Sequence, residues 1–521
     1  MGNSMMKELR TCAVVDLDAI LENVRAICKK AGDGTKVMAV IKTDGYGHGA
    51  VPIAKYIRDE VDAFAVATVD EGIELREAGL NLPILILGYT MKAQYPKLLE
   101  YDIHQSVFTM EDAEALSRAA VAAGKKAKIH IALDTGMGRI GFMPEQESVE
   151  IVRQIRDLPG IELVGMFTHF ATADETDKGY TNLQMERYDR FVEMLSAAGI
   201  EIPVKHICNS AGIMEFDHHR YDMVRAGIIL YGLYPSDEVM KENLSLKPAM
   251  EWKAHVVHVK KVGPGHGISY GKTFVTTKEE TQIATVCVGY GDGYPRSLSN
   301  RGRVLIHGKS VPIIGRVCMD QFMVDVTGMD VKPEDEVTLI GRDGEEFISA
   351  DEIAALTGTI NYEVVCDFGK RVPRIYTGDK LENNSPLIFA ISGYKNSGKT
   401  TLTVKLVSRL TAMGYRVATI KHDGHDFEPD VPGTDSYRHR QAGACGTAVF
   451  SDHRFMIIKD QPEASEEKTD EKILIQMFPD VDIILLEGFK HSSWPKYFCR
   501  YPEEVPDEEA ALKQILNLLK K

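Results

Sequence analysis

Short apolar runs rich in β-branched side chains alternate with amphipathic helical stretches over the first 240 residues. TCAVVDL precedes DAILENVRAICKKAG, TKVMAVIK precedes GAVPIAKYIRDE, and AFAVATV precedes DEGIELREAG. Strands separated by helices run parallel with both faces covered, and this fits the continuous apolar character of the runs. About eight such units favour a closed (β/α)8 barrel, and an open doubly wound sheet is the alternative.

The pattern changes at about residue 245. KAHVVHVKKV, TQIATVCVGY, RVLIHGKSVPII and EVTLIGRDG read as strands separated by turns, which indicates a largely antiparallel β-domain. The polar segment GDKLENNSPL is typical of a linker, and PLIFAISG then opens another α/β unit. A chain of 521 residues is too long for one core. We expect a barrel over residues 1–244, a mostly β-domain over 245–382, a linker at 383–388 and a phosphate-loop domain over 389–521.

Composition excludes several classes of protein. A net charge of −15 argues against broad nucleic-acid binding, which requires a basic face. No apolar run reaches the roughly 18 residues that a membrane span needs, and the N-terminus lacks the apolar core of a signal peptide. The eight cysteines form no CxxC pair, so neither a zinc ribbon nor a disulfide framework is indicated. We expect a cytoplasmic protein with free thiols.

Lys42 is the first residue that suggests chemistry. It ends the apolar run of AVIKTDGYGHGA, so in a barrel it would lie at the C-terminal mouth, where active sites are found. The end of a buried strand is a costly place for an ammonium group. A covalent link from the amine to a carbonyl cofactor would remove that cost. On position alone, a surface lysine with a buried stem is the simpler interpretation.

A series of motifs favours the covalent interpretation. After KTDGYGHG come LDTGMGRIGF, HICNSAG, MVRAGIILYG, ISYGKTF, GYGDGYPR, GRVCMDQFMVDVT and INYEV. In kind and order, between about residues 10 and 380, they resemble the motifs of the alanine racemases, which use pyridoxal 5'-phosphate. That family combines a barrel with a following β-domain. Taken singly, the histidine, arginine and tyrosines in these motifs would read as ordinary core residues.

The resemblance implies roles for the motif residues. Lys42 would carry the cofactor and act as one base, and Tyr270 would be the opposite base, reaching in from the other subunit of a homodimer. Arg225 would face the pyridine nitrogen of the cofactor. His169 would lie beside the cofactor ring and form a hydrogen bond with Arg225. Because arginine does not give up a proton, the ring nitrogen would stay unprotonated, which suppresses transamination.

The remaining site residues follow from the same resemblance. The phosphate and its surroundings would involve Tyr46, Asn209, Ser210, Tyr362 and the backbone amides of Gly227 and Ile228. The substrate carboxylate would meet Arg139 and the backbone N–H of the partner's Met319. The entry would be lined by Tyr290 and Asp320. A tyrosine gate favours a small substrate, so we expect alanine, with serine as the alternative.

One departure from the family concerns the support of Arg139. Many members place a lysine seven residues earlier, which becomes carbamylated and pairs with the arginine. This chain has Ala132 there. We hypothesise that a bound anion such as chloride, or a neighbouring residue, holds Arg139 instead. A non-catalytic cofactor-binding protein is a further alternative, although the presence of Tyr270 argues against it.

The C-terminal domain contains a phosphate-binding loop, ISGYKNSGKTT, with the spacing Gly393-x4-Gly398-Lys399-Thr400 between a strand and a helix. Its expected nucleotide contacts are Gly393, Asn396, Ser397, Gly398, Lys399, Thr400, Thr401 and Glu487. Thr400 and Glu487 are also the candidates for a Mg²⁺ site, although a strand-end glutamate could equally be surface charge.

A second resemblance rests on this loop together with KHDGHDFEPDVPGTDSYRHRQAGA and LLEGFK. These motifs are similar to those of the MobB family of molybdopterin-guanine dinucleotide biosynthesis proteins. That similarity implies GTP binding, weak GTPase activity at most, and a molybdenum-cofactor nucleotidyltransferase as partner. The cluster of His422, Asp423, His425 and Asp426 could ligate a metal, but contact with a nucleotide or anion fits it as well.

Overall fold

The computed structural model divides into two compact units, residues 1–378 and 379–521. It describes residues 8–379 except 219, and residues 386–519 except 395–396, 423–430, 432–433, 443–445, 452–453, 460–473, 476, 479–480, 490–491, 493 and 501–504. Asn396, Asp423, His425 and Asp426 therefore lie outside the described residues, as do residues 383–385 of the expected linker. Within the described part, no helix is long and apolar enough to cross a membrane.

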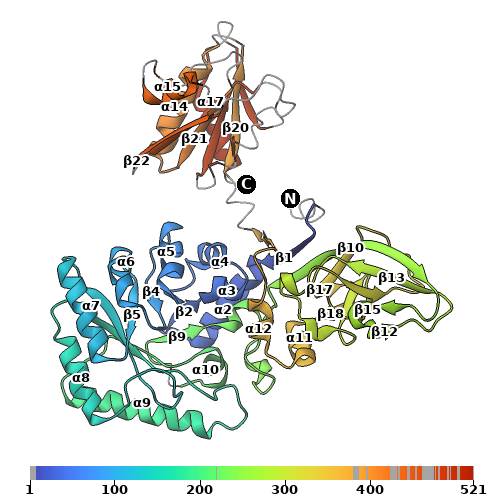
Figure 1. The fold of residues 1–521 in the computed structure, drawn as a ribbon. Helices are drawn as coiled ribbons and strands as arrows, with labels where there is room; N and C mark the ends of the chain where they lie inside the picture. The colour runs from blue at the N-terminus through green and yellow to red at the C-terminus, as the bar shows by residue number, and fades with distance from the viewer. Residues whose placement is uncertain are drawn as a thin grey trace. The chain divides into compact units, whose positions relative to one another are not determined.

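The first unit contains a parallel eight-stranded barrel with helices around it (Figure 1). Its sheet order is β8-β7-β6-β5-β4-β3-β2-β9, and two backbone hydrogen bonds, from Asp222 to Lys205 and from Arg225 to Cys208, bring its ends together. The strands are β2 (Lys36–Val40), β3 (Ala63–Val66), β4 (Ile84–Ile86), β5 (His104–Val107), β6 (Ala127–Ala132), β7 (Ile161–Phe167), β8 (Val204–His206) and β9 (Met223–Ala226). The predicted barrel is thus confirmed over the open sheet.

The helices of this unit follow the strands along the chain. They are α2 (Leu17–Ala31), α3 (Lys42–Tyr46), α4 (Ala50–Ile57), α5 (Val69–Glu77), α6 (Tyr95–Glu100), α7 (Met110–Ala122), α8 (Gln146–Arg156), α9 (Gly179–Ala197) and α10 (Ser210–Glu215). Local capping sets where several begin: Thr68 caps α5 through a reciprocal pair with Glu71, and Asp16 caps α2 through the N–H of Ala19.

The first strand does not belong to the barrel. The sequence pattern placed TCAVVDL at the head of the βαβ series, but β1 (Thr11–Asp16) lies in the second sheet, between β10 (Met250–Val262) and β19 (Arg374–Thr377). An apolar run before a helix shows that a strand forms, but its partners are chosen by long-range pairing. The barrel expected from residue 1 therefore starts after this strand.

The second sheet has nine strands in the order β18-β17-β14-β15-β16-β13-β10-β1-β19. An extra pairing between β10 and β17 closes six of them into a ring. Its other members are β13 (Thr281–Val286), β14 (Arg303–Ile306), β15 (Lys309–Ile314), β16 (Phe322–Asp325), β17 (Glu336–Asp343) and β18 (Glu346–Ile348). The hairpin β11 (Gly267–Ile268)–β12 (Phe274–Val275) projects from it, and α11 (Ala350–Thr357) and α12 (Asn361–Cys366) follow.

The second unit is built on a parallel sheet of order β21-β24-β20-β25. Its elements are β20 (Leu387–Gly393), α14 (Lys399–Ala412), β21 (Val417–Lys421), α15 (Asp435–Gln441), β24 (Ile483–Glu487), β25 (Lys496–Cys499) and α17 (Glu508–Leu518), with a separate ribbon of β22 (Gly446–Ser451) and β23 (Arg454–Lys459). The helices α14 and α17 share one core with the sheet, in which Phe389, Leu406 and Ile515 are fully buried. The expected strand–loop–helix setting of the phosphate loop is therefore present.

Candidate active site

Lys42 begins a strained turn at the C-terminal end of β2. Thr43, Asp44 and Tyr46 have φ values of 54°, 48° and 52°, in the left-handed region that costs a residue with a side chain roughly 1–3 kcal/mol. Side chains hold this turn: the N–H of Thr43 donates to Glu71 Oε1 at 2.7 Å, and Asp44 Oδ1 accepts from the N–H of Ala50 at 2.9 Å. The fold thus fixes the backbone beside the lysine amine.

The surroundings of Lys42 favour its neutral amine. Burial, together with the nearby guanidinium of Arg139, lowers the pKa of Lys42 below its ordinary value. A lowered pKa increases the fraction of neutral amine, which is the form that attacks a carbonyl group.

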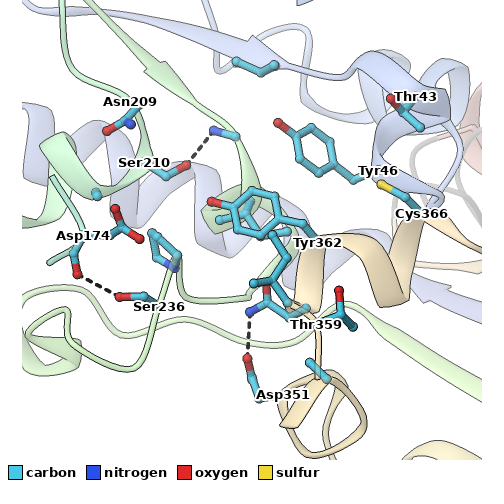
Figure 2. Close-up of a pocket in the computed structure, with 18 of the residues that line it drawn as sticks. Thr43, Tyr46, Asp174, Asn209, Ser210, Ser236, Asp351, Thr359, Tyr362 and Cys366 are labelled. Atoms are coloured by element: carbon cyan, nitrogen blue, oxygen red, sulfur yellow. Dashed lines mark hydrogen bonds between the residues drawn. The ribbon is translucent and has the colours of Figure 1, made fainter. Parts of the chain in front are cut away.

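A cavity of about 660 Å³ opens beside Lys42, within the range of small-molecule sites. Figure 2 shows that its walls come from the barrel and from α12 of the β-domain. Every residue expected to bind the cofactor lines it, although the sequence distributes them over more than 300 positions: Lys42, Tyr46, His169, Asn209, Ser210, Arg225, Gly227, Ile228 and Tyr362.

One end of the cavity is a small polar cradle around Gly227. Ser210 Oγ accepts a hydrogen bond from the N–H of Gly227 at 2.9 Å, and a Cβ added to Gly227 would lie 3.1 Å from the hydroxyl of Tyr46. Burial raises the pKa of Tyr46 and of Tyr362, so both phenols keep the proton that they can donate. Neutral donors around a glycine backbone suit a phosphate group. Asn209 contributes differently, because its side chain caps α10 by accepting from the N–H of Gly212 at 3.0 Å.

Arg225 lies fully inside the barrel without a carboxylate partner among the described residues. Its Nη1 lies 3.0 Å from Nδ1 of His206, and its Nη2 donates to the carbonyl of Thr168 at 2.7 Å. His169, the expected partner, is 3.5 Å away, at the limit of a hydrogen bond. Burial lowers the pKa of His169 to about 3, so its imidazole is neutral. Sequence reasoning missed His206, which stands at the start of HICNSAG and is the nearer imidazole.

A second group of expected residues lies away from this cavity. Tyr270, Tyr290, Met319 and Asp320 are all exposed on the β-domain, and none lines the cavity that contains Lys42. Tyr270 is 69% exposed. Backbone hydrogen bonds join part of the group, from Tyr290 to the carbonyl of Cys318 and from Gly291 to that of Met319. The structure therefore gathers the residues expected to bind the cofactor in one place, and leaves those expected to form the second base and the gate exposed.

Arg139 is exposed in the loop after β6. Among the described residues, no carboxylate oxygen lies close enough to form an ion pair with Arg139. Ala132 is buried at the end of β6, in register with Phe167 of β7, and supplies no charge. Among the described residues, no carboxylate therefore pairs with Arg139 in place of the missing acid.

The phosphate loop of the second unit has a polar interior. Ser397 is completely buried, and its hydroxyl has no hydrogen-bond partner among the residues that the structure describes. Lys399 Nζ donates to the carbonyl of Gly393 at 3.3 Å. Thr400 Oγ1 donates to Glu487 Oε1 at 2.6 Å, so the two candidate metal residues meet at the start of α14. Gly398, with φ 82°, forms the turn before the helix, and Thr401 is exposed.

Comparison with known families agrees with this division. The models for the N-terminal and C-terminal domains of alanine racemase match residues 15–235 and 249–376, and the model described as molybdopterin guanine dinucleotide synthesis protein B matches residues 388–516.

Individual relatives cover the first unit almost completely. An alanine racemase of Clostridium novyi is 47% identical over 376 residues, which are 71% of this chain and 97% of the relative. One from Methanococcus maripaludis is 48% identical over 366 residues, 70% of this chain and 98% of the relative. The solved alanine racemase of Clostridium difficile 630 is 46% identical, with a TM-score of 0.69, and covers 71% of this chain and 96% of its own. The chain therefore belongs to the alanine racemase family, with a molybdopterin guanine dinucleotide synthesis protein B domain fused after the racemase part.

Proposed function

We propose that the first unit interconverts L-alanine and D-alanine by proton transfer between two bases, with pyridoxal 5'-phosphate attached to Lys42. The product D-alanine would serve peptidoglycan synthesis. The observation that carries this proposal is the convergence of nine expected cofactor residues on the cavity beside Lys42. The sequence identity of about 47% to alanine racemases makes alanine the first choice of substrate.

The cavity has a place for each part of the cofactor. When bound, pyridoxal phosphate supplies an electron-accepting ring that makes the α-proton of an attached amino acid removable. Ser210, Tyr46, Tyr362 and the backbone around Gly227 would hold its phosphate. Arg225 would offer a hydrogen bond to the ring nitrogen without giving it a proton.

Racemisation needs a base on each face of the α-carbon. The amine of Lys42 would serve one face, from which it removes or returns the proton. Tyr270 would serve the other face, and because it lies outside the cavity of its own chain, we assign it to the cavity of a second copy. The working enzyme would then be a homodimer in which each subunit completes the other's site.

Substrate binding would use the groups at the rim. Arg139 would pair with the substrate carboxylate, helped by the backbone N–H of the partner subunit's Met319. Tyr290 and Asp320 would line the entry and restrict the size of the side chain. Chloride would take the place of the absent carbamate beside Arg139, because Ala132 leaves the position without an anion.

For the second unit we propose binding of GTP with Mg²⁺. Lys399 would reach the phosphates, and Thr400 and Glu487 would hold the metal between them, directly or through water. A molybdenum-cofactor nucleotidyltransferase in the cytoplasm would be its partner. The observations in support are the contact of Thr400 with Glu487 and the buried hydroxyl of Ser397, which has no partner in the described part of the chain.

The test incubates the purified full chain, loaded with pyridoxal phosphate, with L-alanine and L-serine in separate reactions and analyses the enantiomers. We expect D-alanine as the faster product and no visible absorbance band of a lysine-bound cofactor in Lys42→Ala. Faster racemisation of serine would reassign the substrate. A wild-type protein that shows the band but racemises neither amino acid would make it a non-catalytic cofactor-binding protein.

A further inference from the structure

Three buried histidines extend from Arg225 through the inside of the barrel. His206 ends β8, His130 lies within β6, and His104 begins β5. Nδ1 of His130 lies 2.9 Å from Nε2 of His206, and Nδ1 of His104 lies 3.5 Å from Nε2 of His130. The first of these contacts has the length of a normal hydrogen bond, and the second is at the limit of one. The row crosses from the cofactor end of the barrel to the opposite end of its strands.

The guanidinium determines where the protons of these imidazoles lie. Arginine only donates, so the Nδ1 of His206 at 3.0 Å from Arg225 must accept, and its proton must be on Nε2. That Nε2–H then donates to Nδ1 of His130, which places the proton of His130 on its Nε2 as well. The same argument, applied to the longer contact, gives His104 the same tautomer.

The argument requires neutral imidazoles, and the surroundings provide them. Burial and the charge of Arg225 lower the pKa of His206 well below its ordinary value. Burial lowers the pKa of His130 to about 3 and that of His104 to about 4. Among the described residues, a carboxylate approaches the row only at its far end, where Asp102 faces His104 beside the ammonium of Lys128. Each imidazole therefore has one donor and one acceptor.

Both terminal nitrogens of Arg225 donate hydrogen bonds to protein atoms. Nη1 contacts both Nδ1 and the carbonyl oxygen of His206, and Nη2 donates to the carbonyls of Thr168 and Ile207 at 2.7 and 3.1 Å. These four contacts can account for the four terminal N–H groups, and the contact of Nη2 with Nδ1 of His169 at 3.5 Å is a fifth, weaker one. The Nε–H is left without an acceptor among the described residues, and Arg225 lines the cavity. The side chain thus has one donor to spare for a ligand.

We propose that His206, His130 and His104 form a row of fixed tautomers that positions Arg225 and leaves its Nε–H for the ring nitrogen of the cofactor. With the proton of His206 on Nδ1 instead, two donors would face each other and the guanidinium would have to turn. The proposal rests on the proposed function in assigning Arg225 to the ring nitrogen. The tautomers themselves do not depend on that assignment.

The tautomers can be measured before any cofactor is added. Full-length protein labelled with ¹⁵N-histidine and freed of cofactor is studied by solid-state NMR at neutral pH, with His130→Asn and His206→Asn used to assign the signals. We expect neutral Nε2–H imidazoles at His206 and His130. An Nδ1–H tautomer or an imidazolium at His206 would overturn the proposal, whether or not the protein is a racemase.

Paired substitutions test the positioning role. His130→Asn keeps an acceptor at the Nδ1 position, whereas His130→Leu leaves the Nε2–H of His206 without one. We expect kcat within about threefold of wild type for the asparagine variant and about tenfold lower for the leucine variant, as for one lost buried hydrogen bond. A loosened Arg225 would let the ring nitrogen take a proton from water, and this would remove the suppression of transamination. The leucine variant should therefore transaminate alanine more often and release more pyruvate per racemisation event.

A second pair separates the two bonds of His206. His206→Asn retains the acceptor for Arg225, and His206→Gln retains only the group nearer to His130. We expect the glutamine variant to have the larger pyruvate fraction. Equal losses of activity in both members of each pair, with an unchanged pyruvate fraction, would overturn the positioning role. The histidines would then only fill space inside the barrel. Correct tautomers in a wild-type protein without racemase activity would instead refute the proposed function.

Discussion

Glu71, in the first turn of α5, accepts a hydrogen bond from the backbone N–H of Thr43, the residue after Lys42, at 2.7 Å. Its other oxygen accepts from Ala67 and Thr68 at 2.7 and 3.2 Å. One carboxylate therefore connects the strained turn beside the lysine to the start of α5. A carboxylate suits this task because all three contacts are donors, and an amide would turn its own NH₂ group toward one of them.

Glu71→Gln should accordingly weaken the hold on the turn. We expect kcat/KM to fall by roughly tenfold, the effect of about one disturbed hydrogen bond, with the dimer and the cofactor content retained. Glu74→Gln removes the same charge from an exposed position of α5 and is the control. Steady-state racemisation of both variants measures the difference, and equal activities would show that the carboxylate is dispensable.

Gly227→Ala should impair cofactor binding. The added Cβ would lie 3.1 Å from the Tyr46 hydroxyl and 3.3 Å from Ser210 Oγ, in the space that we assign to the phosphate. We expect the Kd of pyridoxal phosphate to rise by about tenfold or more, which corresponds to about 1.4 kcal/mol. Fluorescence titration measures it. Gly263→Ala, whose new Cβ would meet only Glu279 at 3.8 Å, should bind as wild type does.

Mixed dimers should restore activity that each variant lacks. In a hybrid of Lys42→Ala and Tyr270→Phe subunits, one site keeps both bases and the other has neither. Random reassociation makes half of the dimers hybrid with one good site each, so we expect roughly a quarter of wild-type activity. Mixing either variant with the double variant should restore nothing. If the first mixture also stays inactive although hybrids form, the shared site is wrong.

Chloride should activate the wild-type enzyme. At constant ionic strength, replacing acetate with chloride should lower the KM for alanine, because the anion would orient Arg139 toward the substrate carboxylate. Ala132→Lys, once carbamylated, would supply its own anion and should lose most of this response. Initial rates over a chloride series decide the matter, and identical chloride profiles for the two proteins would exclude the anion at this position.

Nucleotide binding should depend on the second unit alone. Lys399→Ala should abolish GTP binding, and Glu487→Gln should weaken its Mg²⁺ dependence while leaving binding without metal intact. Lys405→Ala, on the same helix but ion-paired to Glu508, is the control. Calorimetry measures binding and the racemase assay runs in parallel. A loss of racemisation in Lys399→Ala would mean that the two activities are coupled.

The architecture of the first unit was predictable because buried parallel strands are encoded by continuous apolar runs in the sequence. β5 is the exception that tests this logic. His104, Gln105 and Ser106 are buried, yet their polar side chains gave no strand signal. They are satisfied inside the barrel, where Ser106 bonds to the carbonyl of Ile86 and Gln105 to that of Gly88. A hydrogen-bonded interior of this kind cannot be read from local hydrophobicity.

The residues of the candidate site also divide into those that the sequence predicted and those that it did not. Lys42, Ser210 and Arg225 could be assigned to one site because their motifs resemble those of the alanine racemases, and strand ends of a barrel converge at its mouth. His206 was missed although it stands in one of those motifs, since its role depends on which side chain faces it from β9. The exposure of Tyr270 also had no signal in the sequence, because it depends on the fold of an entire second domain.

The pairing of β1 has a consequence for how the chain is made. β1 is synthesised before the barrel, but the strands on either side of it, β10 and β19, are synthesised only after the barrel strands. Until residues 250–262 have been made, both edges of β1 lack their partners, a state prone to pairing with other chains. Shielding β1 until residues 250–377 have been synthesised should therefore raise the yield of folded protein.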